Sequence, residues 1–287
     1  MKQLMLLAFA MPMLLTLLSC NEGGELTPEE VGTFQIYFDN KVGTSDITLE
    51  EAGSTSYDFE TTGGEKFNIS SLGYYVSKIS LSGPNGEIYQ DEVLVNASDA
   101  KGYYHVIEGT SVSQNILLEN VPAGTYDQAT FTIGVAEEGV QEGALGGVLD
   151  PANGGWFWNW NAGYIAMIIE GNALNSGQEY VDWGNGSETL AKTFSFHIGG
   201  WKNVPDNENF VNNVRTITVD FGTTVSVGEG LSPLAHVVVD ILKMLEGASV
   251  DFSTTYSVHS PKGGKVFADQ LDQVFSVHHV HQSTSGH

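Results

Sequence analysis

The sequence predicts an all-β protein, an antiparallel β-sandwich with long loops and one or two short helices. Apolar and polar residues alternate in many short runs, as at residues 34–38 and 190–198, and this alternation is typical of half-buried strands. Turn-forming glycines and prolines separate the runs, and the chain has 34 glycines in 287 residues. Short strands between tight turns, with little helical periodicity, favour packed antiparallel sheets.

The N-terminal residues predict export and lipid anchoring. An apolar run from residue 4 to 18 follows Lys2, is too short to span a bilayer comfortably, and ends in Leu17-Leu18-Ser19-Cys20. This ending resembles a bacterial lipobox, in which the signal is cut before the cysteine and the cysteine is lipidated. Cys20 is the one cysteine of the chain, so no internal disulfide can form. The alternative is an ordinary signal with a chance cysteine.

The chain is therefore expected to divide into three parts. Residues 1–19 are a lipoprotein signal peptide, residues 20–32 are the lipidated cysteine and a polar, acidic tether, and residues 33–282 form one domain. We expect the mature protein in the bacterial cell envelope, lipid-anchored, in the periplasm or at the outer-membrane surface.

Local signals define individual elements of the domain. Asn85-Gly86 between apolar runs predicts a hairpin, and Pro122-Ala123-Gly124 predicts a turn into a strand. The segment from Ser232 to Gly247 carries both β-branched residues and helical spacing, so we expect a strand over 235–239 that breaks into a short helix. Further strands are expected at residues 34–38, 66–69, 72–81, 87–89, 93–95, 103–107, 116–118, 128–135, 164–171, 190–198, 214–221, 223–227 and 274–281.

Three of the five tryptophans lie in one short segment, at Trp156, Trp158 and Trp160. Successive side chains of a strand point to opposite faces, so the three indoles are expected on one face, with Phe157 and Asn159 on the other. Such a row is either core filling or a built platform. A platform could stack on a sugar or nucleobase, surround a cation, or hold an indole for oxidation.

The chain has eight histidines, and several lie beside strand ends, where imidazoles on converging strands could share a ligand. On a regular last strand, His279 and His281 would continue the face of Phe275 and Val277, and His278 would lie opposite. Imidazole suits copper, zinc or iron. Taken singly, each histidine is better explained as a hydrogen-bonded residue at a sheet edge than as a metal ligand.

Composition and motifs exclude several functions. The formal net charge of −24, from 35 acidic and 11 basic residues, repels phosphate backbones and excludes nucleic acid as a partner. The sequence has no His-Glu-x-x-His, no phosphate-binding loop and no Gly-x-Ser-x-Gly, so we expect a protein that is not an enzyme and has no catalytic residues. Calcium is a weaker alternative to a transition metal because no spaced loop of oxygen ligands is present.

An ordered set of motifs covers nearly the whole mature domain. In chain order it is Phe38-Asp39-Asn40, Leu72-Gly73-Tyr74-Tyr75-Val76-Ser77, Tyr104-His105-Val106-Ile107, Val121-Pro122-Ala123-Gly124-Thr125-Tyr126-Asp127, the segment from Leu145 to Ile165, Phe196-His197-Ile198-Gly199-Gly200, and Phe275-Ser276-Val277-His278-His279-Val280. With this set the chain resembles the MbnP-like family of copper-binding periplasmic proteins.

The resemblance implies a non-catalytic copper protein of the envelope. His105 and His197 lie inside matching motifs and are the first expected ligands, and His279 and His281 come next. The family site sometimes contains kynurenine, an oxidised tryptophan, and a diheme partner of the MbnH type is associated with that oxidation. Trp158 and Trp160 match the two family tryptophans, whereas Trp156 lies where Met or another apolar residue is expected. The alternative is a surface module that binds carbohydrate or protein through the tryptophan platform.

Overall fold

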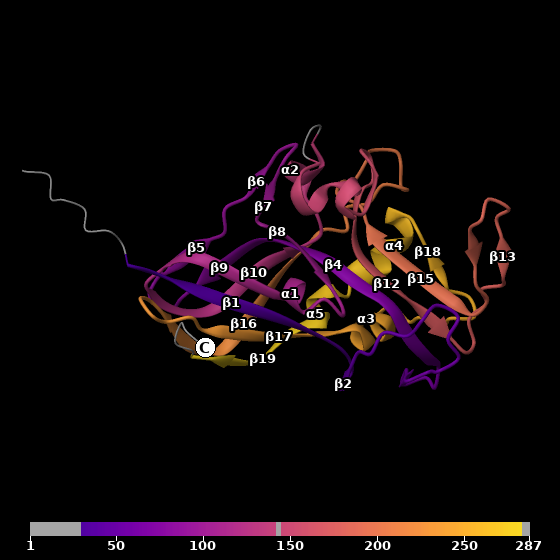
Figure 1. Ribbon diagram of the computed structural model, residues 1–287, viewed down its shortest axis with the longest axis horizontal. Helices are drawn as coiled ribbons and strands as arrows, with labels where there is room; N and C mark the ends of the chain where they lie inside the picture. The colour runs from indigo at the N-terminus through magenta and orange to yellow at the C-terminus, as the bar shows by residue number, and fades with distance from the viewer. Residues whose placement is uncertain (1–29, 142–144, 283–287) are drawn as a thin grey trace, which may run out of the picture.

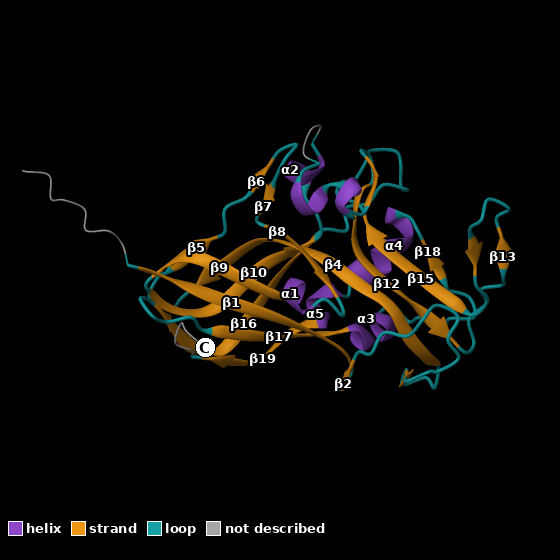
Figure 2. Cartoon of the chain, in the orientation of Figure 1, coloured by secondary structure: helices purple, strands orange, loops and turns teal. Residues whose placement is uncertain are grey.

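Two twisted sheets of unequal size enclose an apolar core in the computed structural model, which describes residues 30–141 and 145–282 (Figure 1). Strands are the main regular structure of the described chain and the helices are short (Figure 2). The predicted all-β sandwich is therefore confirmed. The predicted signal peptide, Cys20 and all but the last residues of the tether lie outside the described residues. Within the described parts, no helix is long and apolar enough to cross a membrane.

The smaller sheet has the order β19-β17-β1-β2, with β9 also paired to β1. Its strands are β1 (Val31–Val42), β2 (Ser45–Asp46), β9 (Asn115–Pro122), β17 (Leu234–Asp240) and β19 (Phe275–His281). β1 and β17 run parallel, which the purely antiparallel prediction did not include. Almost the whole larger sheet lies between them in sequence, so no tight turn fixes their relative direction.

The larger sheet has the order β16-β10-β4-β12-β15-β18, and four short strands pair at its sides. Its strands are β3 (Phe59–Glu60), β4 (Lys66–Ser82), β5 (Ile88–Gln90), β8 (Tyr103–Ile107), β10 (Gly124–Ile133), β11 (Phe157–Asn159), β12 (Gly163–Ala173), β15 (Thr193–Gly199), β16 (Arg215–Val227) and β18 (Ser257–Val258). The apolar β12 lies between β4 and β15, and is a central strand as predicted.

Two small ribbons and several short helices complete the described fold. The ribbons are β6 (Leu94–Val95) with β7 (Ala100–Lys101), and β13 (Val181–Asp182) with β14 (Glu188–Thr189). The helices are α1 (Ser111–Gln114), α2 (Glu137–Val140), α3 (Ile241–Gly247), α4 (Pro261–Ala268) and α5 (Leu271–Val274), with 3₁₀ turns η1 (Gly147–Leu149) and η2 (Pro151–Asn153). More short helices occur than the one or two expected.

Two local predictions are confirmed in detail. The Asn85-Gly86 turn joins β4 to β5, with Ser82 opposite Ile88. β17 breaks directly into α3, and the Asp240 carboxylate accepts a hydrogen bond from the Leu242 amide at 3.1 Å. This carboxylate satisfies a free N–H of the first turn, which explains why the strand ends there.

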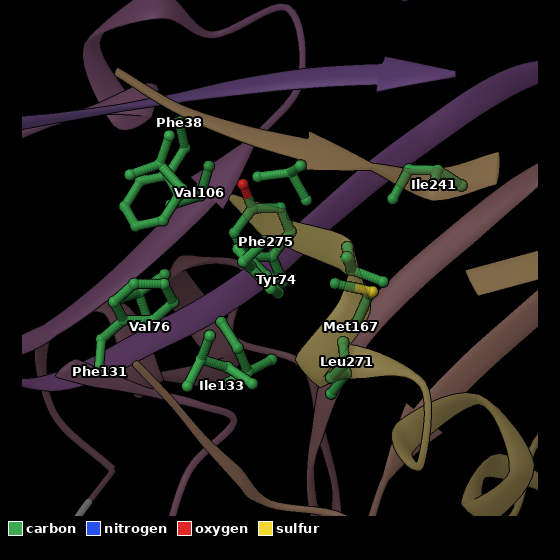
Figure 3. Close-up of a cluster of buried hydrophobic side chains, with 14 of the residues drawn as sticks. Phe38, Tyr74, Val76, Val106, Phe131, Ile133, Met167, Ile241, Leu271 and Phe275 are labelled. Atoms are coloured by element: carbon green, nitrogen blue, oxygen red, sulfur yellow. The ribbon is translucent and has the colours of Figure 1, made fainter. Parts of the chain in front are cut away.

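The core between the sheets is built from aromatic rings (Figure 3). Phe38 of the smaller sheet meets Phe131 of the larger sheet edge to face, with ring centroids 5.5 Å apart, and both rings are fully buried. Phe275 packs against both rings. Edge-to-face pairs add about 0.5–1.5 kcal/mol to the gain from burial, so these rings hold the two sheets in register.

Candidate metal centre

Two histidines meet on the outer face of the larger sheet. In β15, Phe194, Phe196 and Ile198 face the core, so His197 projects outward. β18 runs parallel to the end of β15, with Phe196 opposite Val258, and this pairing places His259 beside His197. The Nδ1 atoms of the two imidazoles lie 3.1 Å apart. Two nitrogen donors therefore converge on one point of the surface.

A carboxylate orients the first of these imidazoles. Glu170 of β12 lies 2.7 Å from His197 Nε2 through its Oε1 atom, and the same oxygen accepts a hydrogen bond from the Ser195 hydroxyl at 3.0 Å. We assign the proton to Nε2, because a carboxylate accepts but does not donate, and this leaves the lone pair of His197 on Nδ1. Carboxylate–histidine pairs of this kind orient metal-binding imidazoles.

The pKa values of Glu170 and His259 bear on whether a ring nitrogen is free to bind a metal ion. The hydrogen bond from His197 lowers the pKa of the Glu170 carboxyl, so Glu170 is ionised at neutral pH. Burial lowers the pKa of His259, and so does the neighbouring charge of His197. A neutral imidazole offers a lone pair, which a protonated one does not. These shifts therefore favour a neutral His259, which has a lone pair that a metal ion can use.

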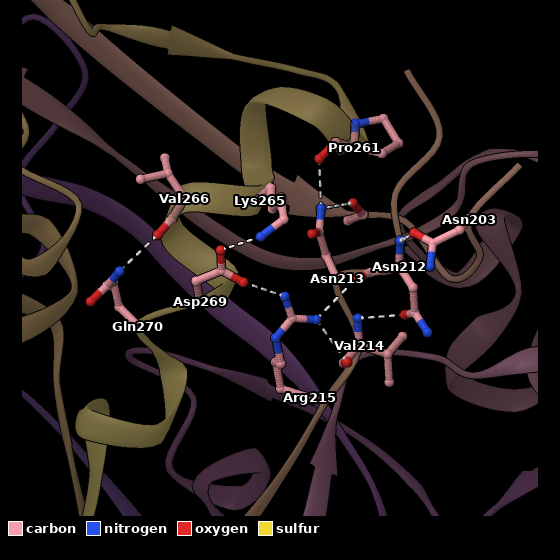
Figure 4. Close-up of polar contacts among 11 residues, drawn as sticks. Asn203, Asn212, Asn213, Val214, Arg215, Pro261, Lys265, Val266, Asp269 and Gln270 are labelled. Atoms are coloured by element: carbon pink, nitrogen blue, oxygen red, sulfur yellow. Dashed lines mark hydrogen bonds and ion pairs between the residues drawn. The ribbon is translucent and has the colours of Figure 1, made fainter. Parts of the chain in front are cut away.

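Asn213 ties the end of β15 to the start of α4, close to the two histidines (Figure 4). Its side chain is fully buried, and its Nδ2 atom donates to the carbonyl oxygens of Gly199 and Pro261, each at 2.7 Å. Gly199 follows His197 by two residues, and Pro261 follows His259 by two. One amide group thus ties both flanks of the site together. The adjacent Arg215–Asp269 ion pair, at 2.7 Å, links β16 to the end of α4.

Trp158 lies next to the histidine pair. A Cβ atom placed on Gly199 would lie 2.9 Å from Cζ3 of Trp158, so the indole covers this glycine directly. Gly199 and His197 are two residues apart on one strand and share a face, with Cα atoms about 6.8 Å apart. The half-buried indole of Trp158 therefore covers β15 at a position two residues beyond His197.

A surface cleft opens beside the pair on its other side. It has a volume of about 740 Å³, and its lining includes Glu170, His197, His259 and Trp183. Trp183 is 63% exposed on the β13–β14 ribbon. The histidine pair is thus accessible from solvent.

His105 forms a second histidine–tryptophan contact. On β8, its ring stacks on Tyr75 at 4.3 Å and meets Trp156 edge to face at 4.2 Å between centroids. Trp156 lies over Gly73, where an added Cβ would come within 2.7 Å of its Cη2 atom. Burial lowers the pKa of His105 to about 4, and its Nε2 atom is buried without a hydrogen-bond partner. His105 is therefore a neutral imidazole with one unsatisfied nitrogen.

Comparison with known proteins identifies the family of the chain. A family model described as MbnP matches residues 31–260. The chain belongs to the MbnP family. The predicted family resemblance is confirmed. The solved structure of MbnP from Methylosinus trichosporium matches with a TM-score of 0.52 and 13% identity, and the match covers 90% of this chain and 100% of that one. At this identity the likeness shows the fold. No curated protein matches this chain significantly in sequence.

The structure of this MbnP-family protein does not bring His105 and His197 into one cluster. His105 lies opposite Tyr75 of β4, Gly73 of β4 lies opposite Ile168 of β12, and Ile168 lies opposite His197. Three ladder steps of about 4.8 Å separate the two histidines, so their Cα atoms lie on the order of 15 Å apart. Each histidine instead has its own neighbouring indole on the same face of the sheet.

The expected row of three indoles is wrong at Trp160. β11 ends at Asn159, whose side-chain oxygen accepts hydrogen bonds from the amides of Asn161 and Ala162 at 2.9 and 3.0 Å. This side-chain turn stops the strand alternation. Trp160 packs on Phe157, 4.9 Å between centroids, although Phe157 was assigned to the opposite face. Trp156 and Trp158 remain on the sheet, and Trp160 is 43% exposed beside them.

The expected faces of the last strand are also wrong. A bulge interrupts the pairing of β17 with β19, so that Val237 lies opposite Val277 whereas His236 lies opposite His279. The extra residue is His278. Phe275 and Val277 therefore face the core, whereas His279 and His281 pass to the outer face and do not continue the apolar stripe. His278 joins them and does not lie opposite.

Sequence reasoning did not single out three residues of these sites. His259, His236 and Glu170 were not selected, although each has a polar partner in the structure. Glu170 had a detectable signal, because it is the one charged residue in the apolar run at 164–171. For His259 and His236 the sequence contains no comparable signal, since their partners come from distant strands.

Proposed function

We propose that this MbnP-family protein binds copper in the bacterial cell envelope and catalyses no reaction of its own. Copper follows from the family resemblance, and the residues fit it. The observation that carries the proposal is the facing pair of Nδ1 atoms in His197 and His259, 3.1 Å apart, with Glu170 holding the far nitrogen of His197. Copper(I) is satisfied by few, soft or borderline donors, and imidazole is such a donor.

Trp158 is our first candidate for oxidation to kynurenine. It covers Gly199 beside His197 and is half-buried, so a modified side chain would remain near the two imidazoles. Conversion of tryptophan to kynurenine is an oxidative cleavage of the C2–C3 bond of the indole, after which hydrolysis releases the C2 carbon as formate and leaves an aromatic amine that can serve as a nitrogen donor. The structure holds no oxidant, and we propose a diheme partner of the MbnH type for this role. Trp156, in contact with His105, is the second candidate.

His105 is the alternative ligand. Its unsatisfied Nε2 atom and neutral state suit a metal, but within the described residues its ring contacts are with Tyr75 and Trp156, and no second imidazole or carboxylate is among them. The His197–His259 pair offers two nitrogens and an orienting carboxylate. We therefore place copper at the pair.

The anchoring proposal concerns the N-terminal residues. We propose cleavage after residue 19, lipidation of Cys20 and an acidic tether that holds the domain off the membrane, in the periplasm or at the outer-membrane surface. Mass spectrometry of protein extracted from membranes tests it. A diacylglyceryl group on an N-terminal Cys20 is expected, and an unmodified thiol in the mature protein contradicts it.

Copper titration of wild type and two variants tests the site. Full-length protein is titrated with copper(I) against a chromophoric chelator, beside the double variant His197→Asn/His259→Asn and the single variant His105→Asn. We expect the double variant to lose copper at chelator concentrations where wild type keeps it, and His105→Asn to keep it. Equal retention by wild type and the double variant contradicts the assignment.

The alternative function, a platform that binds carbohydrate or protein, is less well supported because the three indoles do not share one face. Trp156 and Trp158 lie against glycines of the sheet, and Trp160 folds onto Phe157, so no flat row of three indoles forms. Glycan binding by copper-free protein that Trp158→Ala abolishes would restore this alternative.

A further inference from the structure

A second group of imidazoles lies on the smaller sheet, where β17 meets β19. We propose that His236, His278 and His279 form a second metal site, for a divalent ion of borderline softness such as Zn²⁺, with His281 holding the far nitrogen of His279. Ligand atoms of the first three histidines all lie within 4.8 Å of one another. The four residues are called the β19 cluster below.

The bulge in β19 creates this cluster. In a regular strand, neighbouring residues such as His278 and His279 point to opposite faces. Here both stand against the single residue His236, and the ring centroids of His236 lie 5.6 Å from His278 and 4.8 Å from His279. A bulge of this type re-aims side chains and is found next to functional sites.

The donor atoms are close to the spacing that a metal needs. His278 Nδ1 lies 2.6 Å from His279 Nδ1, and His279 Nε2 lies 2.7 Å from His281 Nε2. In a tetrahedral zinc site with Zn–N bonds of about 2.0–2.1 Å, ligand nitrogens lie about 3.3 Å apart. Rotations of exposed rings are enough to reach this spacing, since His278 and His281 are exposed and His279 is half-buried.

A carboxylate orients the most buried member of the cluster. His236 Nε2 lies 2.9 Å from Asp39 Oδ2, and the Asp39 side chain is 15% exposed. With Nε2 bound to the carboxylate, Nδ1 of His236 is the nitrogen left for a ligand. Lys41 shares the same Asp39 oxygen at 3.0 Å, so the carboxylate is held in place from two sides.

The β19 cluster is separate from the proposed copper centre. It shares no residue with His197, His259 or Glu170 and lies on the other sheet. The family match ends at residue 260, before β19 begins. A bulge with polar residues can also serve only to protect an edge strand from aggregation, and in that case no metal affinity is expected.

Equilibrium dialysis against Zn²⁺ distinguishes a metal site from a bulge that only protects the edge strand. Full-length wild type is compared with His278→Asn/His279→Asn and with His197→Asn/His259→Asn, each checked for folding by circular dichroism. We expect the first double variant to bind one Zn²⁺ fewer per chain than wild type, and the second to keep the Zn²⁺ of the β19 cluster. Wild type and the first variant binding the same amount, or wild type binding none, overturns the site. The copper result at His197 and His259 does not affect this outcome.

Two aspartate variants provide a matched test that leaves all the histidine ligands intact. Asp39→Asn removes the charge that orients His236, and we expect Zn²⁺ affinity to fall about 10- to 100-fold. Asp46→Asn is the control, because Asp46 also pairs with Lys41 but contacts no histidine of the cluster. Because the ion would join β19 to β17, Zn²⁺ should also raise the thermal midpoint of wild type more than that of Asp39→Asn. Equal affinity in the two aspartate variants contradicts the role of Asp39.

Discussion

The buried imidazole of His105 should make the stability of the metal-free protein depend on pH. Its pKa is about 4 in the folded state, against 6.5 in the absence of burial. The folded protein therefore binds fewer protons than the unfolded chain between these values. The sign follows from linkage: the contribution of His105 is fully present above about pH 6.5 and is lost as pH falls toward 4.

The magnitude follows from the same two pKa values. A full difference of about 2.5 pKa units corresponds to roughly 3 kcal/mol, of which about 2 kcal/mol falls between pH 7 and pH 5. The ring is partly exposed, although its Nε2 atom is not, and solvent screening reduces the expected loss to about 1–1.5 kcal/mol. Carboxylates titrate mainly below this range, so they contribute little to it.

The assay compares wild type with His105→Asn, which cannot titrate here. Urea unfolding of both proteins, without metal, at pH 7 and pH 5 gives four free energies of unfolding. Other histidines with lowered pKa, such as His259, contribute to both proteins and cancel in the difference. We expect wild type to lose about 1–1.5 kcal/mol more than the variant on acidification. Equal losses would refute the reasoning from burial.

Three further changes test the remaining parts of the structure. Glu170→Gln removes the charge that orients His197 and should weaken copper binding about 10- to 100-fold. Glu188→Gln, at the same cleft, should leave the copper affinity unchanged. Equal copper affinities of the two variants contradict the orienting role of Glu170. Asn213→Ala leaves two buried carbonyl oxygens without their donor and should lower the free energy of unfolding by about 1–3 kcal/mol; a loss below about 0.5 kcal/mol in urea denaturation opposes the bridging role. Phe38→Ala opens the centre of the core and should cost about 3–5 kcal/mol, and a change within error in the same assay would mean that the ring does not join the sheets.

The fold was predictable where local chemistry decides it. Three consecutive β-branched residues at Val237–Val239 favour a strand, and Asp240 then caps a helix, so both the strand and its break could be read from neighbouring residues. The Asn85-Gly86 hairpin is equally local. The parallel pairing of β1 with β17 joins segments almost 200 residues apart, and no local signal specifies it.

The candidate sites were only partly predictable, because register and long-range pairing assemble them. His197 was selected from its motif, but its partner His259 arrives through the β15–β18 pairing and the Asn213 bridge. The bulge at His278 depends on how β19 fits against β17, and a shift of one residue moves side chains to the other face. Trp160 does not lie in the predicted row because the Asn159 side chain accepts a hydrogen bond from the Asn161 amide and forms a turn there.

The most direct test of the copper centre is nuclear magnetic resonance of protein with ¹⁵N-labelled histidine, titrated with copper(I). This ion is diamagnetic, so each imidazole reports whether it becomes a ligand. At the first equivalent of copper, we expect the ¹⁵N resonances of the His197 and His259 rings to shift and those of His105 to stay unchanged. Shifts confined to His105, with His197 and His259 unchanged, would contradict it.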